Sequence, residues 1–169
     1  MLRNRKPHRE AVGPGQESVW DYPRPPELQP TTEHVRVVHR GVVLADSHRC
    51  WRILETSHAP AYYIPATDVA TEFLRTSDLS TVCEFKGRAT YADIVVPDSV
   101  VQNAAWWYAN PTSGYEAMQD AISFYPQRVD LCEVDGEAVT PLASSFYGDW
   151  PTSRIAGPYK GGVPGSEWW

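Results

Sequence analysis

The stretch "TVCEFKGRATYADIVV", residues 81–96, decides the fold class, because apolar and polar residues alternate on both sides of a short polar corner. Alternation with a period of two is typical of a β-strand that buries one face. Gly87, at the corner, can adopt the positive φ that a tight turn between two strands requires. The stretch therefore predicts an antiparallel hairpin that turns at Lys86-Gly87.

The same pattern recurs along the chain. Short runs rich in β-branched and aromatic residues flank Arg40-Gly41 in "HVRVVHRGVVLAD", residues 57–60 in "CWRILETSHAPAYYIP" and Asp135-Gly136 in "VDLCEVDGEAVTP". Asp-Gly between two such runs is a strong signal for a two-residue hairpin turn. Eight short runs separated by tight turns predict an all-β protein of mainly antiparallel sheets, arranged as a sandwich or a small barrel.

Two segments carry weak helical patterns. "PATDVATEFLRTS", residues 65–77, offers Thr67 or Asp68 as a cap and enough apolar spacing for about two turns. "SGYEAMQDAISFY", residues 113–125, predicts a second short helix. We expect both helices to cover sheet edges or barrel ends.

The chain divides into a central domain and two arms. Residues 34–141 hold the strand patterns and are expected to form a single β domain. Residues 1–33 are expected to be a disordered or Pro-rich arm, because four prolines between Trp20 and Thr31 favour an extended chain. Residues 142–169 are rich in Gly, Pro and aromatic residues, and we expect an irregular arm that packs on the domain.

The charge distribution argues against nucleic acid as the main partner. The chain has a net charge of −6, and beyond the basic residues 1–10 it holds 11 basic and 20 acidic side chains. Proteins that bind a phosphate backbone need clustered Lys and Arg. No apolar run approaches the ~18 residues of a membrane span, and no secretory signal follows the first charges, so a cytoplasmic protein without membrane contact is expected.

The cysteines and histidines do not predict a metal site. Cys50, Cys83 and Cys132 are odd in number and widely spaced, which argues against a disulfide framework or a zinc knuckle. His34 and His39 lie five residues apart and point to opposite faces of a strand. We therefore expect no metal and no cofactor.

The polar corner after residue 81 offers two candidate groups. Strand alternation puts Cys83 on the side of Phe85, as a core residue, and Lys86 on the other side. A reactive Cys83 thiol with its pKa lowered by Lys86 is the alternative. Lys86 and Arg88 at the corner could bind a phosphate or carboxylate, or form only a charged turn.

Two further segments contribute candidate residues. Glu55 ends a predicted strand and could meet the Tyr62-Tyr63 pair across the hairpin in a polar pocket, or lie exposed at the strand end. "AAWWYANP", residues 104–111, predicts a strand with Trp106 and Tyr108 on one face and Trp107 on the other. One of these faces fills the core, and the other could floor a pocket or pack beneath the C-terminal arm.

Taken in order, these segments resemble a bacterial family known as domain of unknown function four hundred and twenty-seven. The resemblance rests on "VVLADSHRCWRILETSHAPAYYIPATDV", "CEFKGRATYADIVV", "AAWWYANP" and "ISFYPQRVDLCEVDGEAV", and covers about residues 34–141, with "GPYKGG" in the closing extension. It implies a β-tent-like layout, whose better-known relatives hold zinc between two cysteine pairs that this chain lacks. The matching positions include Glu55, Tyr63, Cys83, Lys86, Tyr91, Trp106 and Tyr108.

The sequence departs from that family at one place and does not support one of its labels. Ala92 follows Tyr91 where the family has an aromatic pair, which removes part of any shared pocket wall. The family is also labelled nucleotidyltransferase-like, but the chain has no Gly-Ser with paired aspartates to hold a magnesium nucleotide.

These observations lead to one main functional hypothesis and two alternatives. The main hypothesis is a cleft that binds a small anionic or polar ligand and is lined by Glu55, Tyr63, Lys86, Tyr91, Trp106 and Tyr108. The first alternative is a transferase-like or thiol-dependent enzyme with Glu55, Cys83 or Lys86 as catalytic residue. The second is an interaction module that docks on a partner, or on a second copy as a homo-oligomer, through the N-terminal arm and Trp168-Trp169.

Overall fold

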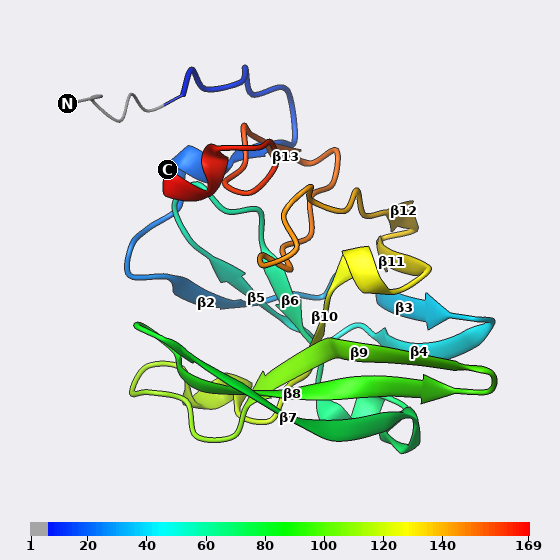
Figure 1. Ribbon diagram of the computed structural model, residues 1–169. Coiled ribbons are helices and arrows are strands. Elements are labelled where there is room, and N and C mark those ends of the chain that lie inside the picture. Colours follow the sequence, from blue (N-terminus) through cyan, green and yellow to red (C-terminus); the bar gives the residue numbers. More distant parts are fainter. Residues whose placement is uncertain (1–6) are drawn as a thin grey trace.

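The computed structural model describes residues 7–169, and most of its regular structure is antiparallel β-sheet (Figure 1). The all-β fold class predicted from the sequence is confirmed. The strands are β1 (Glu17–Ser18), β2 (Glu27–Pro30), β3 (Val35–His39), β4 (Val42–Ser47), β5 (Trp51–Leu54), β6 (Ala61–Tyr63), β7 (Leu74–Cys83), β8 (Gly87–Val96), β9 (Ser99–Tyr108), β10 (Ser123–Phe124), β11 (Leu131–Val134), β12 (Glu137–Ala138) and β13 (Ile155–Ala156).

The strands form three antiparallel sheets and one short parallel pair. The sheet orders are β10-β9-β8-β7, β12-β11-β3-β4 and β2-β5-β6, and β1 pairs with β13 in parallel. In Figure 1 the long strands β7, β8 and β9 cross below β2, β5 and β6. Within residues 7–169 none of these sheets closes on itself, so the small barrel weighed for this sequence is not formed.

The predicted hairpins are present. β3 and β4 pair across Arg40-Gly41, and β11 and β12 pair across Asp135-Gly136. Both residues of each turn have positive φ, between 50° and 79°, which is the conformation that two-residue hairpin turns require. β7 and β8 form the hairpin of residues 81–96, with Cys83 opposite Gly87, so the turn lies at residues 84–86 and not at the predicted Lys86-Gly87.

The two-turn helix predicted for residues 65–77 is wrong. The chain there makes two single 3-10 turns and then enters β7, which begins at Leu74 and pairs with β8. A helix of two turns is marginal by itself, whereas pairing with β8 satisfies backbone groups along a ten-residue strand. The second predicted helix is likewise reduced to one turn. The 3-10 turns are η1 (Val19–Asp21), η2 (Ala66–Asp68), η3 (Thr71–Phe73), η4 (Glu116–Met118), η5 (Pro126–Arg128) and η6 (Ser166–Trp168).

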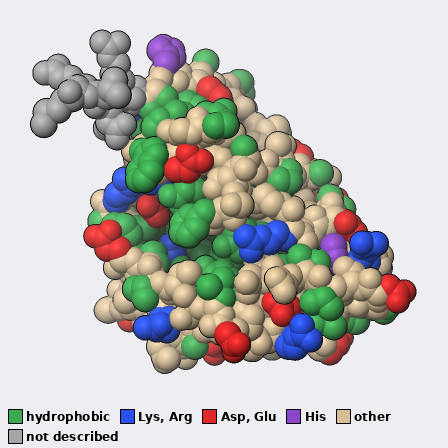
Figure 2. Space-filling view, in the orientation of Figure 1, with side chains coloured by type: hydrophobic (Ala, Val, Ile, Leu, Met, Phe, Trp, Pro, Cys, Tyr) green, Lys and Arg blue, Asp and Glu red, His purple; other side chains and the backbone are tan. Residues whose placement is uncertain are grey.

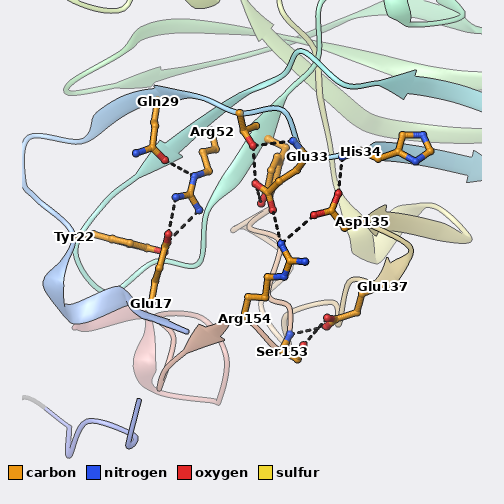
Figure 3. A network of polar contacts seen from close by, with 12 residues as sticks. Glu17, Tyr22, Gln29, Glu33, His34, Arg52, Asp135, Glu137, Ser153 and Arg154 are labelled. Carbon is orange, nitrogen blue, oxygen red and sulfur yellow. Dashed lines mark hydrogen bonds and ion pairs between the residues drawn. The ribbon is translucent and has the colours of Figure 1, made fainter. Parts of the chain in front are cut away.

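The described part of the N-terminal segment is tightly attached to the sheets. Val19, Trp20 and Tyr22 are buried, and β2 extends the sheet of β5. Figure 3 shows the polar contacts nearby: Arg52 donates hydrogen bonds to both carboxylate oxygens of Glu17, at 2.8 and 3.1 Å, and Tyr22 donates one at 2.5 Å. The arm therefore packs through its aromatic residues, while the boundaries expected for a domain at 34–141 stay a prediction.

Of the three buried clusters in the described residues, two fill the space between the sheets, and the third packs Val19 and Trp20 of the N-terminal segment against Ile155. The largest cluster joins β3, β4 and β11 to β8 and β9, and includes Trp150 of the C-terminal segment, whose indole donates to the carbonyl oxygen of Phe124 at 3.0 Å. The second cluster is mainly aromatic and contains Trp106 and Tyr108. Trp107 packs against the first cluster, so the two faces predicted for residues 104–111 are confirmed.

Candidate functional site

A cavity of about 480 Å³ opens where the β7–β8–β9 sheet, the β5–β6 hairpin and the C-terminal segment meet. Figure 2 shows hydrophobic side chains gathered around a hollow on this side of the molecule, with basic and acidic side chains near it. All six residues predicted to bind a ligand, and Cys83, line this one cavity. The lining is Ile53, Glu55, His58, Ala59, Ala61, Tyr63, Thr81, Val82, Cys83, Glu84, Phe85, Lys86, Tyr91, Trp106, Tyr108, Tyr125, Phe146, Tyr147, Gly148, Asp149 and Lys160.

The walls of the cavity are aromatic rings held by one another. Trp106 donates from Nε1 to the hydroxyl of Tyr63 at 3.2 Å, with the two rings perpendicular and 6.2 Å apart. Tyr125 packs on the other side of Trp106, with ring centroids 4.6 Å apart, and Tyr108 lies 6.1 Å from Tyr63. Interlocked rings of this kind restrain one another, so the rings of the walls hold their positions.

The tyrosine hydroxyls of the walls keep their protons. Burial raises the pKa of Tyr63, Tyr108 and Tyr125 above the usual value of 10. Near neutral pH these groups are therefore neutral phenols, each with one O–H donor, and Tyr125 uses its donor on the carbonyl oxygen of Phe146 at 3.3 Å.

Lys86 brings a positive charge into this aromatic site. Thr112 fixes its position, because the Thr112 amide donates to the Lys86 carbonyl oxygen at 3.0 Å and the Thr112 hydroxyl donates to the carbonyl oxygen of Phe85. The Lys86 ammonium lies 5.9 Å from the centre of the Tyr108 ring. Among residues 7–169 no carboxylate lies within 4.0 Å of it.

The surroundings of Lys86 keep its ammonium charged. Burial lowers the pKa of Lys86, but the acidic groups around it, Glu55 among them, raise it more, and the result is a pKa of about 12. A lysine in contact with aromatic rings therefore carries a full positive charge at neutral pH without a direct counter-ion among the described residues.

The prediction that Cys83 and Lys86 lie on opposite sides of the hairpin is wrong. Cys83 and Phe85 do pack together against the aromatic cluster, as alternation predicts. However, β7 ends at Cys83, so alternation does not continue through the turn, and Lys86 returns to the same cavity. Both side chains line that cavity, on the same side of the hairpin.

The cavity also holds a histidine between two carboxylates, which the sequence analysis missed. His58 Nδ1 lies 2.9 Å from Asp149 Oδ2, and His58 Nε2 lies 3.6 Å from Glu55 Oε2. Glu55 also meets Arg24 at 3.4 Å. His58 lies in the turn that follows Glu55, a local signal that could have been used, whereas Asp149 is 91 residues away and gives no such signal.

The C-terminal segment completes the cavity. Gly148 packs flat on Trp106, and a Cβ at this position would lie 2.5 Å from the indole ring, so only glycine fits without moving the wall. Tyr147 next to it packs edge-on against His58, at 5.1 Å, and carries the Lys160 ammonium 5.6 Å above its ring. The arm predicted to pack on the domain thus contributes residues to the same cavity as Lys86.

No group of three or more His, Cys, Asp or Glu side chains in residues 7–169 is arranged to hold a metal ion. The same part of the chain has no helix that is long and apolar enough to cross a membrane.

Comparison with known proteins adds a family but no activity. The family model described as a domain of unknown function (DUF427) matches residues 27–135. No curated protein matches the chain. The matched range contains every residue predicted to line the site, and it leaves out Asp149 and Lys160, which come from the C-terminal segment.

Proposed function

Because the chain belongs to the family described as a domain of unknown function (DUF427), which names no activity, we propose a function from its site: the aromatic cavity binds a small molecule through an anionic group. The observation that carries this proposal is the charged Lys86 ammonium, which faces aromatic rings and has no carboxylate within 4.0 Å in the described chain. Lys86 is only partly exposed, and a partly buried charge is stabilised by an opposite charge and hydrogen bonds. A phosphate or carboxylate group supplies both.

The rest of the cavity suits such a ligand. The chain has only three lysines, and two of them, Lys86 and Lys160, line this cavity. The protonated hydroxyls of Tyr63 and Tyr108 can donate to the same anion, and the faces of the rings can cover an apolar body. A volume of about 480 Å³ lies within the range of small-molecule sites, roughly 300–1,000 Å³.

The test is a binding screen with a matched pair of variants. Inorganic phosphate, sugar phosphates, nucleotides and aromatic carboxylates are each added to the wild-type protein, and the melting temperature is measured. A ligand that binds only the folded state raises the melting temperature. We expect at least one anion to do so, and Lys86→Met to weaken its binding about tenfold or more, or ~1.4 kcal/mol, by calorimetry.

Arg88→Met is the control, because it removes an equal charge from the same hairpin at an exposed residue outside the cavity lining. It should bind the same anion as tightly as the wild type does. The proposal fails if no anion in the panel raises the melting temperature, or if both variants bind equally well.

A second candidate function is an enzyme, and the specific observation that favours it is His58. An imidazole held by a carboxylate on one nitrogen can accept or donate a proton at the other. His58 is held in this way by Asp149, and it shares the cavity with Cys83, Glu55 and Lys86, the catalytic candidates from the sequence. In this function Lys86 orients the substrate anion and His58 transfers the proton.

Turnover separates this enzyme from a binding protein. Each anion that binds is incubated with the wild-type protein and followed by NMR. An enzyme consumes at least one compound, and His58→Gln lowers the rate by about 100-fold or more while binding persists. If no bound compound is consumed, or if His58→Gln turns it over at the wild-type rate, His58 has no role in proton transfer.

A further inference from the structure

The charged residues that line the cavity are of both signs. Two are lysines, Lys86 and Lys160, and three are carboxylates, Glu55, Glu84 and Asp149. Carboxylates in the lining would repel a simple anion and weaken its binding. Because two of these acids are less than a fifth exposed, their charges act inside the site and not only in the solvent around it.

Positive and negative groups come from different walls. Lys86 lies in the turn between β7 and β8, whereas Glu55 follows β5 and Asp149 belongs to the C-terminal segment. Lys86 and Glu55 are more than 4.0 Å apart, yet the Glu55 carboxylate contributes to raising the pKa of Lys86. The two charges therefore act on each other across the cavity without forming an ion pair.

The two carboxylates keep acceptor capacity for a ligand. The contacts described for Glu55 use Oε2, which faces His58 and Arg24, and the contact described for Asp149 uses Oδ2. A carboxylate can accept about four hydrogen bonds at its two oxygens. The other oxygen of each group is free to meet a donor within the described site.

From these charges we propose that the ligand of the cavity is a zwitterion, a small molecule with a cationic ammonium group as well as its anionic group, attached to an aromatic body. The inference rests on the proposed anion-binding function. The ligand's anion meets Lys86, its ammonium meets Glu55 and Asp149, and its ring packs against the aromatic wall of the cavity.

The physical reason is the cost of unmatched charge in a partly enclosed site. An anion without a cationic group binds Lys86 but brings its charge near Glu55 and Asp149, and a cation without an anionic group is repelled by Lys86. A zwitterion pairs with both and introduces no net charge. Its ammonium is also attracted by the faces of the surrounding aromatic rings.

Two matched sets of probes test the inference on the wild-type protein. Tryptophan is compared with indole-3-propionate, which lacks the ammonium, and with tryptamine, which lacks the carboxylate. Phenylalanine, 3-phenylpropionate and phenethylamine form a second set with a smaller ring. In calorimetry we expect a zwitterion to bind at least about tenfold more tightly than both of its partners.

A variant links the preference to the carboxylate wall. Glu55→Gln should reduce the advantage of the zwitterion over the matching carboxylate, and it should leave the affinity of that carboxylate equal or higher. The same measurement on Glu27→Gln, an exposed glutamate outside the cavity, should show the wild-type preference.

The outcomes separate this inference from the function on which it rests. If a simple anion binds through Lys86 and neither zwitterion binds more tightly than its carboxylate partner, the zwitterion inference is overturned and the anion site stands. If no anion and no zwitterion binds, both proposals are overturned.

Discussion

Tyr63 links the two halves of the aromatic cavity. It comes from β6, and its hydroxyl accepts the hydrogen bond from the indole of Trp106 on β9. Tyr63 is 2% exposed, so water does not replace that contact if it is lost. This hydrogen bond thus joins the two sheets at the wall of the cavity.

Tyr63→Phe removes this acceptor and leaves a buried indole N–H without a partner. We expect a loss of about 1–3 kcal/mol in the free energy of unfolding, which is the usual cost of an unsatisfied buried donor. Urea unfolding measures it. Tyr91→Phe is the comparison, because the hydroxyl of Tyr91 meets the short side chain of Thr81 at the strand edge, and the loss should be smaller. Equal losses of unfolding free energy in the two variants would show that the hydrogen bond to the Trp106 indole contributes no more than the contact with Thr81.

The residues of the site differ in how far the sequence could predict them. Glu55, Tyr63 and Lys86 lie at or beside the ends of strands in two local hairpins, so strand patterns mark these positions, but their meeting in one cavity depends on how the two sheets pack. Asp149 reaches the cavity only because the C-terminal segment folds back over Trp106. Such a contact depends on tertiary packing and leaves no period in the sequence.

At the scale of elements, turn chemistry was the most reliable signal. Arg40-Gly41 and Asp135-Gly136 predict their hairpins because the required positive φ is a local property of two residues. The helix expected at residues 65–77 was wrong because its weak spacing competes with a long-range partner, β8, that the local sequence does not reveal. Local rules thus predict turns better than they predict what a segment pairs with.

The turn that carries Lys86 depends on Gly87. Its φ of 108° is disfavoured for residues with a side chain, and an added Cβ would lie 3.3 Å from the carbonyl oxygen of Asn110. We expect Gly87→Ala to lower the free energy of unfolding by more than the roughly 1–2 kcal/mol that a side chain in a left-handed conformation costs. It should also weaken anion binding, because it displaces Lys86.

Gly41→Ala is the matched control for this change. Gly41 also has a positive φ, at 76°, but its Cβ would meet open space. In urea unfolding, Gly41→Ala should lose less unfolding free energy than Gly87→Ala, and its anion binding should be unchanged. If Gly87→Ala is as stable as Gly41→Ala and binds normally, the close approach to Asn110 does not constrain the turn.

At the scale of the whole molecule, the N-terminal segment is attached through a charge pair. Burial raises the pKa of Glu17, but hydrogen bonds from Arg52 and Tyr22 lower it more, so that it lies below the usual 4.5. A carboxyl with a depressed pKa in the folded state stabilises that state above its unfolded pKa. This stabilisation is lost as the pH falls through the folded value.

Stability should therefore fall on acidification through this pair. We expect the difference in unfolding free energy between the wild-type protein and Glu17→Gln to be largest near pH 6 and to shrink below pH ~4.5, since protonated Glu17 and Gln are alike in charge. Urea unfolding between pH 6 and 3 measures it. A difference that stays constant across this range would show that the Glu17 charge does not stabilise the segment.

The parallel pairing of β1 with β13 joins the two ends of the described chain side by side. Around it, the Glu10 amide donates to the carbonyl oxygen of Gly157 and the Glu17 amide donates to that of Arg154. Since the strands are parallel, a force that pulls the segment before β1 away from the segment after β13 acts along both strands in opposite directions. It loads these hydrogen bonds together, in shear, instead of breaking them in turn as in a zipper. The β1–β13 pair should therefore resist mechanical separation of the two terminal segments.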